Sequence, residues 1–253
     1  MISVGLDVGS RTIKVATFDT AVRDCLVTET GANPLRRCQE LMSGINYDRM
    51  VVTGYGRHLV APALGGEIVS EIKAFAVGAR HLYPDCCTII DIGGQDCKVI
   101  LLTDAGEVQK FEMNDRCAAG TGKFLEIMAD TLEVKISGLG NLALCATRTV
   151  QINSLCTVFA ESEVVSLIAR GEESGAIALG LHRAIASRIA TMARRVGTRK
   201  RVVFAGGAAL NPCLYRLVAE QLEVELTVPP QPQIVGAVGA SILAQNFHST
   251  ANI

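Results

Sequence analysis

Two nine-residue segments of this 253-residue chain follow one pattern, and this repeat constrains the fold more than any other feature. They are DVGSRTIKV at 7–15 and DIGGQDCKV at 91–99, and in each a Gly stands two places and a Lys seven places after the Asp. Apolar runs before each Asp and after each Lys predict two β-strands joined by a tight turn. Two hairpins built alike indicate a duplicated fold that grips one ligand between its halves.

Both hairpin turns combine a carboxylate with glycine backbone that can approach a ligand closely. The ligand that most needs this combination is a polyphosphate with its Mg²⁺. We expect Asp7 and Asp91 to hold hydrated Mg²⁺ and Gln95 to orient a water. For Lys14, a phosphate contact and an ordinary solvated position at the start of a strand are both open. The residues expected at the phosphates are Gly9, Ser10, Thr12, Lys14, Gly93 and Gly94.

A third glycine turn, Gly206–Gly207 in FAGGAALN, separates a predicted strand from a predicted helix. The segment CAAGTGKF at 117–124 lacks the spacing of a P-loop, and no Rossmann glycine pattern follows the first strand. One such turn alone is more often structural than functional, whereas three turns together with the repeat favour a nucleotide site. We add Gly120, Gly122, Gly206 and Gly207 to the candidate nucleotide-binding residues, and Asn211 and Gln231 as candidates near the adenosine.

The rest of the chain alternates between predicted strands and helices, which favours an α/β fold. A polar region is expected after Leu132, and VELTVPP at 224–230 is expected to be a strand. The predicted helices cover 70–84, 122–132, a segment from about 157, 175–196, the segment after 211, and 234–245.

Composition excludes two classes of protein. The net charge of −1 and the absence of Trp, with 4% aromatic residues, leave neither a basic footprint nor a stacking surface for nucleic acid. Hydrophobic residues make up 49% of the chain, but no apolar run reaches the roughly 18 residues that span a bilayer. The first residues read as a strand rather than a signal peptide. We therefore expect a soluble cytoplasmic protein that binds neither nucleic acid nor membrane.

The nine cysteines do not form a recognisable framework of their own. Their number is odd, and no two are spaced as C-x-x-C, which argues against a disulfide scaffold and a zinc ribbon. Most are expected to be small buried side chains. The four histidines have no convergent context, and none is assigned to catalysis.

Several strings resemble one family over essentially the entire chain: GLDVGSRTIK, VTGYGR, IDIGGQDCK, NDRCAAGTGKFLE, CTVFAESEV and PPQPQIVGAVGA. They are similar to the activator ATPases of 2-hydroxyacyl-CoA dehydratases, a family that includes the ATPase subunits of benzoyl-CoA reductases. The resemblance implies two ribonuclease-H-like domains of the actin, Hsp70 and sugar-kinase fold, with an interdomain nucleotide cleft. It places the first domain at 1–85, with a C-terminal helix at about 235–253 packing back on it, and the second at 86–234.

The same resemblance implies a role for two cysteines. Cys117 and Cys156 match the residues that, from both protomers of a homodimer, hold one shared [4Fe–4S] cluster. The implied activity is ATP hydrolysis coupled to transfer of a low-potential electron. A reduced ferredoxin or flavodoxin is the implied donor, and an acyl-CoA dehydratase or reductase is the implied acceptor. Both cysteines precede predicted helices, where the helix dipole stabilises a thiolate.

Several alternatives stay open on the sequence. A small-molecule kinase of the sugar-kinase type, or a non-redox module of the Hsp70 or actin type, explains the repeated turns equally well but leaves both cysteine strings without a role. The chain is also compatible with the ATPase subunit of a benzoyl-CoA reductase, including one that pairs with a paralogous subunit. Arg11 replaces the Thr or Ser common in relatives, and contacts either phosphate or solvent.

Overall fold

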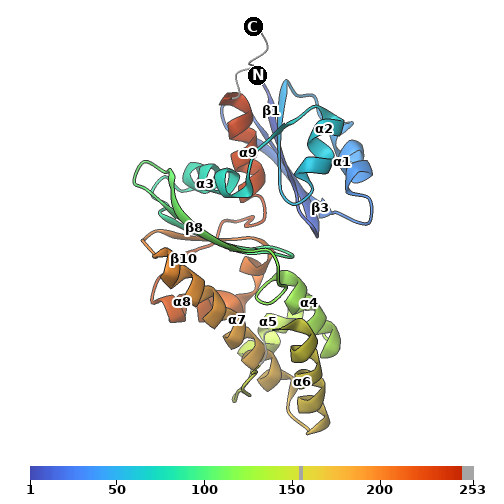
Figure 1. Ribbon diagram of the computed structural model, residues 1–253, viewed down its shortest axis with the longest axis vertical. Coiled ribbons are helices and arrows are strands. Elements are labelled where there is room, and N and C mark those ends of the chain that lie inside the picture. Colours follow the sequence, from blue (N-terminus) through green and yellow to red (C-terminus); the bar gives the residue numbers. More distant parts are fainter. Residues whose placement is uncertain (154–155, 247–253) are drawn as a thin grey trace. The chain divides into compact units, whose positions relative to one another are not determined.

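The computed structural model describes residues 1–153 and 156–246, which form two compact units. The first unit contains Met1–Cys86, Leu102–Gln109 and the segment from Gln233, and the second contains Cys87–Leu101 and Lys110–Pro232. Each unit is built on one five-stranded sheet (Figure 1). Of the helix expected at 235–253, residues 247–253 lie outside the described part of the chain.

The sheet of the first unit has the strand order β3-β2-β1-β4-β5. The central strand β1 pairs with β2 in antiparallel and with β4 in parallel register. The hairpin expected from the first repeat is therefore β1 and β2. The strands are β1 (Ser3–Val8), β2 (Thr12–Phe18), β3 (Val22–Glu29), β4 (Arg49–Thr53) and β5 (Glu67–Ile68).

The two faces of this sheet are covered by different helices, as Figure 1 shows. Val4, Leu6 and Val8 of β1 are buried in one cluster with residues of α1 (Pro34–Met42) and α2 (Arg57–Leu64). Successive side chains of a strand point to opposite faces, so Ser3, Gly5 and Asp7 face the other side. That side receives α9 (Val235–Asn246), which also packs on α3 (Glu71–Leu82).

Helix α9 approaches the first strand unusually closely. A Cβ on Gly5 would overlap the backbone of Ala237 and Ser241, and a Cβ on Gly239 would overlap the backbone of α3 at Ala74. Gly5 therefore allows the last helix to lie directly on β1, and Gly239 allows the same helix to lie against α3. The contact brings the N-terminus of α9 to the end of β1 where Asp7 lies.

The sheet of the second unit repeats the arrangement of the first, with the order β10-β9-β6-β7-β8. Its central strand β6 pairs with β7 in antiparallel and with β9 in parallel register. The trio β7-β6-β9 thus corresponds to β2-β1-β4, which confirms the duplication that the repeated hairpins predict. The strands are β6 (Thr88–Ile92), β7 (Cys97–Leu102), β8 (Val108–Asn114), β9 (Val202–Ala205) and β10 (Leu226–Thr227).

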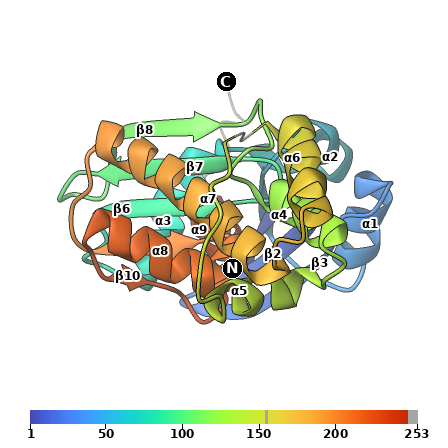
Figure 2. The ribbon, with the colours of Figure 1, turned by 90° about the horizontal axis from the view of Figure 1, so that it is seen from below.

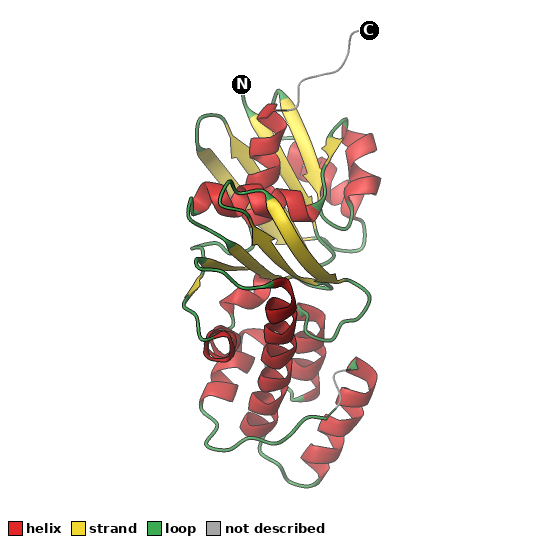
Figure 3. Cartoon of the chain, turned by 60° about the vertical axis from the view of Figure 1, so that its left-hand side comes forward, coloured by secondary structure: helices red, strands yellow, loops and turns green. Residues whose placement is uncertain are grey.

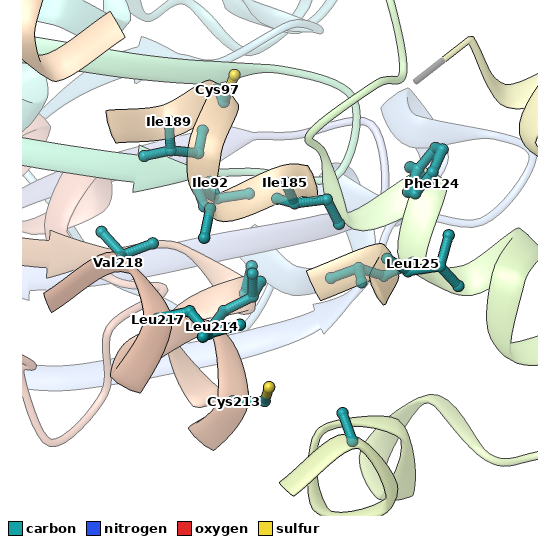
Figure 4. Packing of buried hydrophobic residues seen from close by; sticks show 14 of the residues in the cluster. Ile92, Cys97, Phe124, Leu125, Ile185, Ile189, Cys213, Leu214, Leu217 and Val218 are labelled. Atoms are coloured by element: carbon teal, nitrogen blue, oxygen red, sulfur yellow. The ribbon is translucent and has the colours of Figure 1, made fainter. Parts of the chain in front are cut away.

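Helices gather on one face of the second sheet, where α7 and α8 lie across its strands (Figure 2). In Figure 3 the strands of this sheet are yellow and the helices on that face are red. Ile92 of β6 packs with Ile185 and Ile189 of α7 and with Leu214 of α8 in one buried cluster (Figure 4). The helical elements are α4 (Gly122–Thr131), α5 (Ile136–Leu144), α6 (Thr157–Ala169), α7 (Ser174–Val196), the short 3₁₀ helix η1 (Gly207–Leu210) and α8 (Pro212–Leu222).

Two details differ from the sequence expectations. The region after Leu132, expected to be polar, contains helix α5, in which Leu139 and Ala143 are fully buried. The strand expected at 224–230 is reduced to the two residues of β10, because the prolines that follow have no amide hydrogen for a sheet ladder. Among the described residues, no helix combines the length and the apolar composition that crossing a membrane requires.

Candidate functional site

Asp7 lies near the end of β1 and is buried beside a lysine from the same hairpin. The antiparallel register sets Lys14 opposite Asp7, and the Lys14 Nζ lies 3.3 Å from the Asp7 Oδ2. The side chain of Lys14 is 15% exposed and that of Asp7 is 6% exposed. The seven-residue spacing of the repeat therefore produces an ion pair across the hairpin.

Two glycines leave the space that the Asp7 carboxylate occupies. Gly54 follows β4 with φ +89°, and a Cβ there would lie 2.5 Å from the Asp7 Oδ1. Gly236, in the first turn of α9, would place a Cβ 3.3 Å from the Asp7 Oδ2. Asp7 is thus enclosed by a parallel strand end and by a helix N-terminus, where the dipole favours negative charge.

The turn after Asp7 is held by hydrogen bonds from both ends. The Gly9 amide donates to the Thr12 carbonyl at 3.0 Å. The Thr30 hydroxyl donates to the Gly9 carbonyl at 2.8 Å, and the Thr30 amide donates to the Arg11 carbonyl at 3.0 Å. Ser10 is half-buried, whereas the Arg11 side chain is exposed. Thr30 therefore fixes the turn that the sequence assigns to phosphate.

Asp91 repeats the position of Asp7 in the second unit, with a tighter ion pair. The Lys98 Nζ lies 2.8 Å from the Asp91 Oδ2 and 2.5 Å from the Asp96 Oδ2. The side chains of Lys98 and Asp91 are only 2% and 3% exposed. A buried lysine held by two carboxylates costs desolvation free energy, which close geometry of this kind offsets.

The glycine turn at Gly206 leaves space for the Asp91 carboxylate, as Gly54 does for the Asp7 carboxylate. Gly206 has φ +84°, and a Cβ there would lie 2.6 Å from the Asp91 Oδ1. The Gly206 amide donates to the Pro232 carbonyl at 2.9 Å. This bond brings the exposed Gln231 close to the turn that Gly206 and the exposed Gly207 form.

The second phosphate turn is bonded directly to helix α4. The Gly93 amide donates to the Asp96 carbonyl at 2.9 Å, as Gly9 does in the first turn. The Gly122 amide then donates to the Gly93 carbonyl at 2.9 Å, and the Lys123 amide to the Gly94 carbonyl at 2.8 Å. Amides in the first turn of a helix have no acceptor within the helix, so these two can donate to the turn. The candidate nucleotide residues Gly93, Gly94 and Gly122 thus meet in one place, while Gln95 is exposed.

The loop that carries Cys117 is organised by Asn114. The Asn114 side-chain amide donates to the Cys117 carbonyl at 2.8 Å and to the Ala119 carbonyl at 3.3 Å. Gly120 has φ +83°, and a Cβ there would lie 3.2 Å from the Arg188 Cδ of helix α7. The Cys117 side chain is half-buried at the edge of this loop.

Cys156 is the N-cap residue of α6 and is exposed. Helix α6 packs on α4, the helix that follows Cys117. The buried cysteines differ in chemistry, because burial raises the pKa of the Cys97 and Cys213 thiols to about 11. Those thiols stay protonated at neutral pH. Within residues 1–153 and 156–246, no three side chains of His, Cys, Asp or Glu gather as a metal site.

Asn211, expected near adenosine, makes bonds within its own unit. Its Oδ1 caps helix α8 by accepting from the Cys213 and Leu214 amides, each at 3.1 Å. Its Nδ2 lies 2.9 Å from the Nε2 of His182, whose Nδ1 lies 2.7 Å from the Ala178 carbonyl. Burial lowers the pKa of His182, which favours the neutral ring that accepts from Asn211. The structure therefore gives Asn211 a capping role that the sequence did not indicate.

Sequence reasoning missed several residues that build this site. Gly54, Gly236 and Asn114 lie in strings that carry the family resemblance but have no role predicted from the sequence, and Thr30 lies in none of these strings. The ion pair of Lys98 with Asp91 could have been predicted from the sequence, because an Asp and a Lys seven residues apart in a hairpin with this turn are register partners. The contacts of Gly54 and Gly236 join distant segments and leave no local signal.

Comparison with known proteins agrees with the family resemblance of the sequence motifs. The chain matches the BadF/BadG/BcrA/BcrD ATPase family over residues 4–244. It is 39% identical over 252 residues to the (R)-2-hydroxyglutaryl-CoA dehydratase activating ATPase of Acidaminococcus fermentans, a match that covers 96% of each chain.

Two solved structures bear on the fold. The activator of the 2-hydroxyisocaproyl-CoA dehydratase from Clostridium difficile with bound ADPNP is similar with a TM-score of 0.89 and 37% identity, over 97% of this chain and 95% of that one. A ROK family glucokinase from Streptomyces griseus is similar with a TM-score of 0.62 at 11% identity, over 98% of this chain and 100% of that one, and shows a shared fold alone. These likenesses confirm the predicted α/β class and the ATPase fold shared with sugar kinases.

Proposed function

This chain belongs to the BadF/BadG/BcrA/BcrD ATPase family, and from that premise we propose that it is an ATP-dependent reductive activator. In this proposal it transfers a low-potential electron from a [4Fe–4S] cluster to a partner acyl-CoA dehydratase or reductase. The relative from Acidaminococcus fermentans carries the name of a dehydratase activating ATPase, which supports the activator role.

The paired hairpin turns support ATP with Mg²⁺ as the nucleotide. Carboxylates are the protein ligands that Mg²⁺ takes, usually one or two together with several waters. Asp7 and Asp91 are assigned to the metal, and Gln95 to the attacking water. The residues assigned to phosphate and nucleotide are Gly9, Ser10, Arg11, Thr12, Lys14, Gly93, Gly94, Gly120, Gly122, Gly206, Gly207 and Gln231; Asn211 is kept as a candidate through its backbone, since its side chain caps α8.

Cys117 and Cys156 fit the thiolate ligands of an iron–sulfur cluster. Both lie outside the deep core, and Cys156 is the N-cap residue of α6, a position where helix amides stabilise an anionic group. A [4Fe–4S] cluster takes four thiolates and supplies one-electron redox chemistry when bound. Each chain provides only the two assigned cysteines, so the proposal includes a homodimer in which each protomer supplies a pair.

The exposed face of α6 supports the homodimer. Val158, Phe159 and Val165 are 69%, 67% and 54% exposed, and Ile168 is 42% exposed. Large apolar side chains gathered on one short helix indicate a surface that another protein covers. Because this surface begins two residues after Cys156, a second copy that covers it also brings its own cysteines close.

The observation that carries the proposal is the backbone link between the second phosphate turn and helix α4. The Gly122 and Lys123 amides donate to the Gly93 and Gly94 carbonyls, and Cys117 stands five residues before Gly122. A change of the turn between nucleotide states therefore moves or breaks the bonds that hold the start of α4. This gives the nucleotide differential contacts with two arrangements of the cysteine loop, which is what coupling requires.

The proposed partners follow from the direction of electron flow. A reduced ferredoxin or flavodoxin is the proposed donor, and a separate acyl-CoA dehydratase or reductase is the proposed acceptor. The two dehydratase-activating relatives carry the names of different acyl-CoA substrates, 2-hydroxyglutaryl-CoA and 2-hydroxyisocaproyl-CoA. The substrate of the partner is therefore left at the level of an acyl-CoA.

Anaerobic purification of the full chain tests the cluster. We expect a brown dimer with about four irons per dimer, and loss of iron and colour in Cys117→Ser and Cys156→Ser. Cys145→Ser is the matched control, because Cys145 is exposed but unassigned, and it should retain its iron. Full iron content in both Cys117→Ser and Cys156→Ser contradicts the ligand assignment.

The same preparation separates the alternatives. A colourless protein that transfers phosphate from ATP to a sugar would identify a kinase. Native mass spectrometry distinguishes a homodimer from the heteromer expected of a benzoyl-CoA reductase subunit. ATP hydrolysis by Asp7→Asn at the wild-type rate would contradict the nucleotide assignment.

A further inference from the structure

Thr53 is the last residue of β4, and its hydroxyl has no hydrogen-bond partner among the described residues. The residue is fully buried. Buried hydroxyls in native proteins are nearly always paired with protein groups or ordered water, because leaving them unpaired costs free energy. The Thr53 hydroxyl therefore indicates a partner that the described residues do not supply.

The register of the first sheet sets Thr53 beside Asp7. The two residues are partners in the parallel pairing of β1 and β4. Val52 packs with α1 and α2, whereas Val51 packs with α9, so alternation places Thr53 on the α9 face together with Asp7. The next residue, Gly54, leaves the space for the Asp7 Oδ1. The hydroxyl is thus a neighbour of this carboxylate without being bonded to it.

The second unit has no equivalent hydroxyl. The register partner of Asp91 on β9 is Ala205. The ion pair of Asp91 with Lys98 is also closer than that of Asp7 with Lys14, and Lys98 contacts Asp96 as well. The two halves of the duplicated fold therefore differ at this position. Only the half that contains Asp7 has a hydroxyl here, and that hydroxyl has no hydrogen-bond partner among the described residues.

We propose that the Thr53 hydroxyl positions a water molecule of the hydrated Mg²⁺ that Asp7 binds, an inference that rests on the proposed nucleotide site. Mg²⁺ gives up its waters reluctantly, and a site with one or two carboxylates keeps several of them. Those waters need acceptors, and a threonine hydroxyl both accepts and donates. Thr53 is in this sense a positioning residue, since it acts on the metal through water.

Substitution by an isosteric residue without the hydroxyl tests this role. Thermal unfolding of the full chain is followed with ADP while Mg²⁺ is titrated, for wild type, Thr53→Val and Thr53→Ser. Loss of one hydrogen bond to the metal's water should raise the Mg²⁺ concentration at half-maximal stabilisation by roughly tenfold in Thr53→Val. Thr53→Ser should stay near wild type. Without Mg²⁺, Thr53→Val should melt no lower than wild type, because the Thr53 hydroxyl has no hydrogen-bond partner within residues 1–153 and 156–246.

A buried threonine of the same sheet is the matched control. The Thr17 hydroxyl of β2 accepts from the Asp24 amide at 3.2 Å, so Thr17→Val should lower the melting temperature and leave the Mg²⁺ midpoint unchanged. A Thr53→Val protein with the wild-type Mg²⁺ midpoint, or one that melts lower by the same amount with and without Mg²⁺, would overturn the inference, as would its failure to fold. A wild-type protein that neither ADP nor Mg²⁺ stabilises would overturn the proposed function instead.

Discussion

The buried ion pair at Lys98 makes a strong prediction about stability. Replacing Lys98 by Met keeps a side chain of similar length but removes the ammonium group that contacts Asp91 and Asp96. Asp91 is then left buried with a negative charge and without its cation. Asp96 is 21% exposed and can turn to water, so the main cost falls on Asp91.

The magnitude follows from burial and distance. Lys98 and Asp91 are 2% and 3% exposed and lie 2.8 Å apart. Removing one partner of a buried pair of this kind costs about 3–5 kcal/mol. For a chain of this size, 1 kcal/mol shifts the melting temperature by about 2–4 °C, so Lys98→Met should melt roughly 6–20 °C below wild type. Lys14→Met should lose less, because Lys14 is 15% exposed and 3.3 Å from Asp7.

The assay is urea unfolding followed by circular dichroism, with the double variant Lys98→Met/Asp91→Asn as the critical sample. If the cost comes from the stranded carboxylate, neutralising Asp91 should recover at least about 1 kcal/mol of the loss. A loss below about 1 kcal/mol in Lys98→Met, or a double variant no more stable than the single one, would refute this reasoning.

Three further predictions concern the glycines and the capping network. Gly54→Ala and Gly206→Ala should each lower the free energy of unfolding in urea by about 2–5 kcal/mol, because each adds a Cβ within 2.6 Å of a buried carboxylate oxygen at positive φ. Gly65→Ala is the control, since Gly65 has φ +71° but nothing within 4 Å, and it should lower that free energy by only about 1 kcal/mol. Equal losses in all three variants would contradict the contact argument. Burial lowers the pKa of His182, so the unfolded chain takes up the proton first and stability should fall as pH drops below about 6.5; His182→Gln should flatten that dependence, and an unchanged slope in pH-dependent unfolding would speak against it. Asn211→Ala should cost about 1–2 kcal/mol by removing the α8 cap, and a cost near zero would show that the cap is dispensable.

The hairpins could be predicted from the sequence because their signals are local. An Asp, a glycine turn and a Lys within nine residues determine the strand ends, the turn and the register together. The register also decides where Lys14 points, and this the sequence left open between phosphate and solvent. In the structure, Lys14 contacts Asp7, since an antiparallel pair sets the two residues opposite each other on one face.

The surroundings of the two carboxylates could not be predicted, because they come from distant parts of the chain. Gly54 reaches Asp7 through parallel pairing, and Gly236 reaches it through a helix at the far end of the sequence. Helix α5 was missed for a different reason. The segment was expected only to be polar, but burial of Leu139 and Ala143 against neighbouring helices outweighs the weak helix propensity of its two glycines and its Asn.

The close seat of α9 on β1 also sets an order in which the molecule can be completed during synthesis. The first sheet leaves the ribosome early, but the helix that covers its Asp7 face is encoded after residue 234. The second unit lies between these two segments in the sequence and has a core of its own, so it can fold as a unit. Closing the first unit must then bring Gly5 and Ala237 together across more than two hundred residues. If the second unit within that loop is already folded, the loop has less conformational entropy to lose on closure. The turn that comes first in the sequence is thus among the last to acquire its native surroundings.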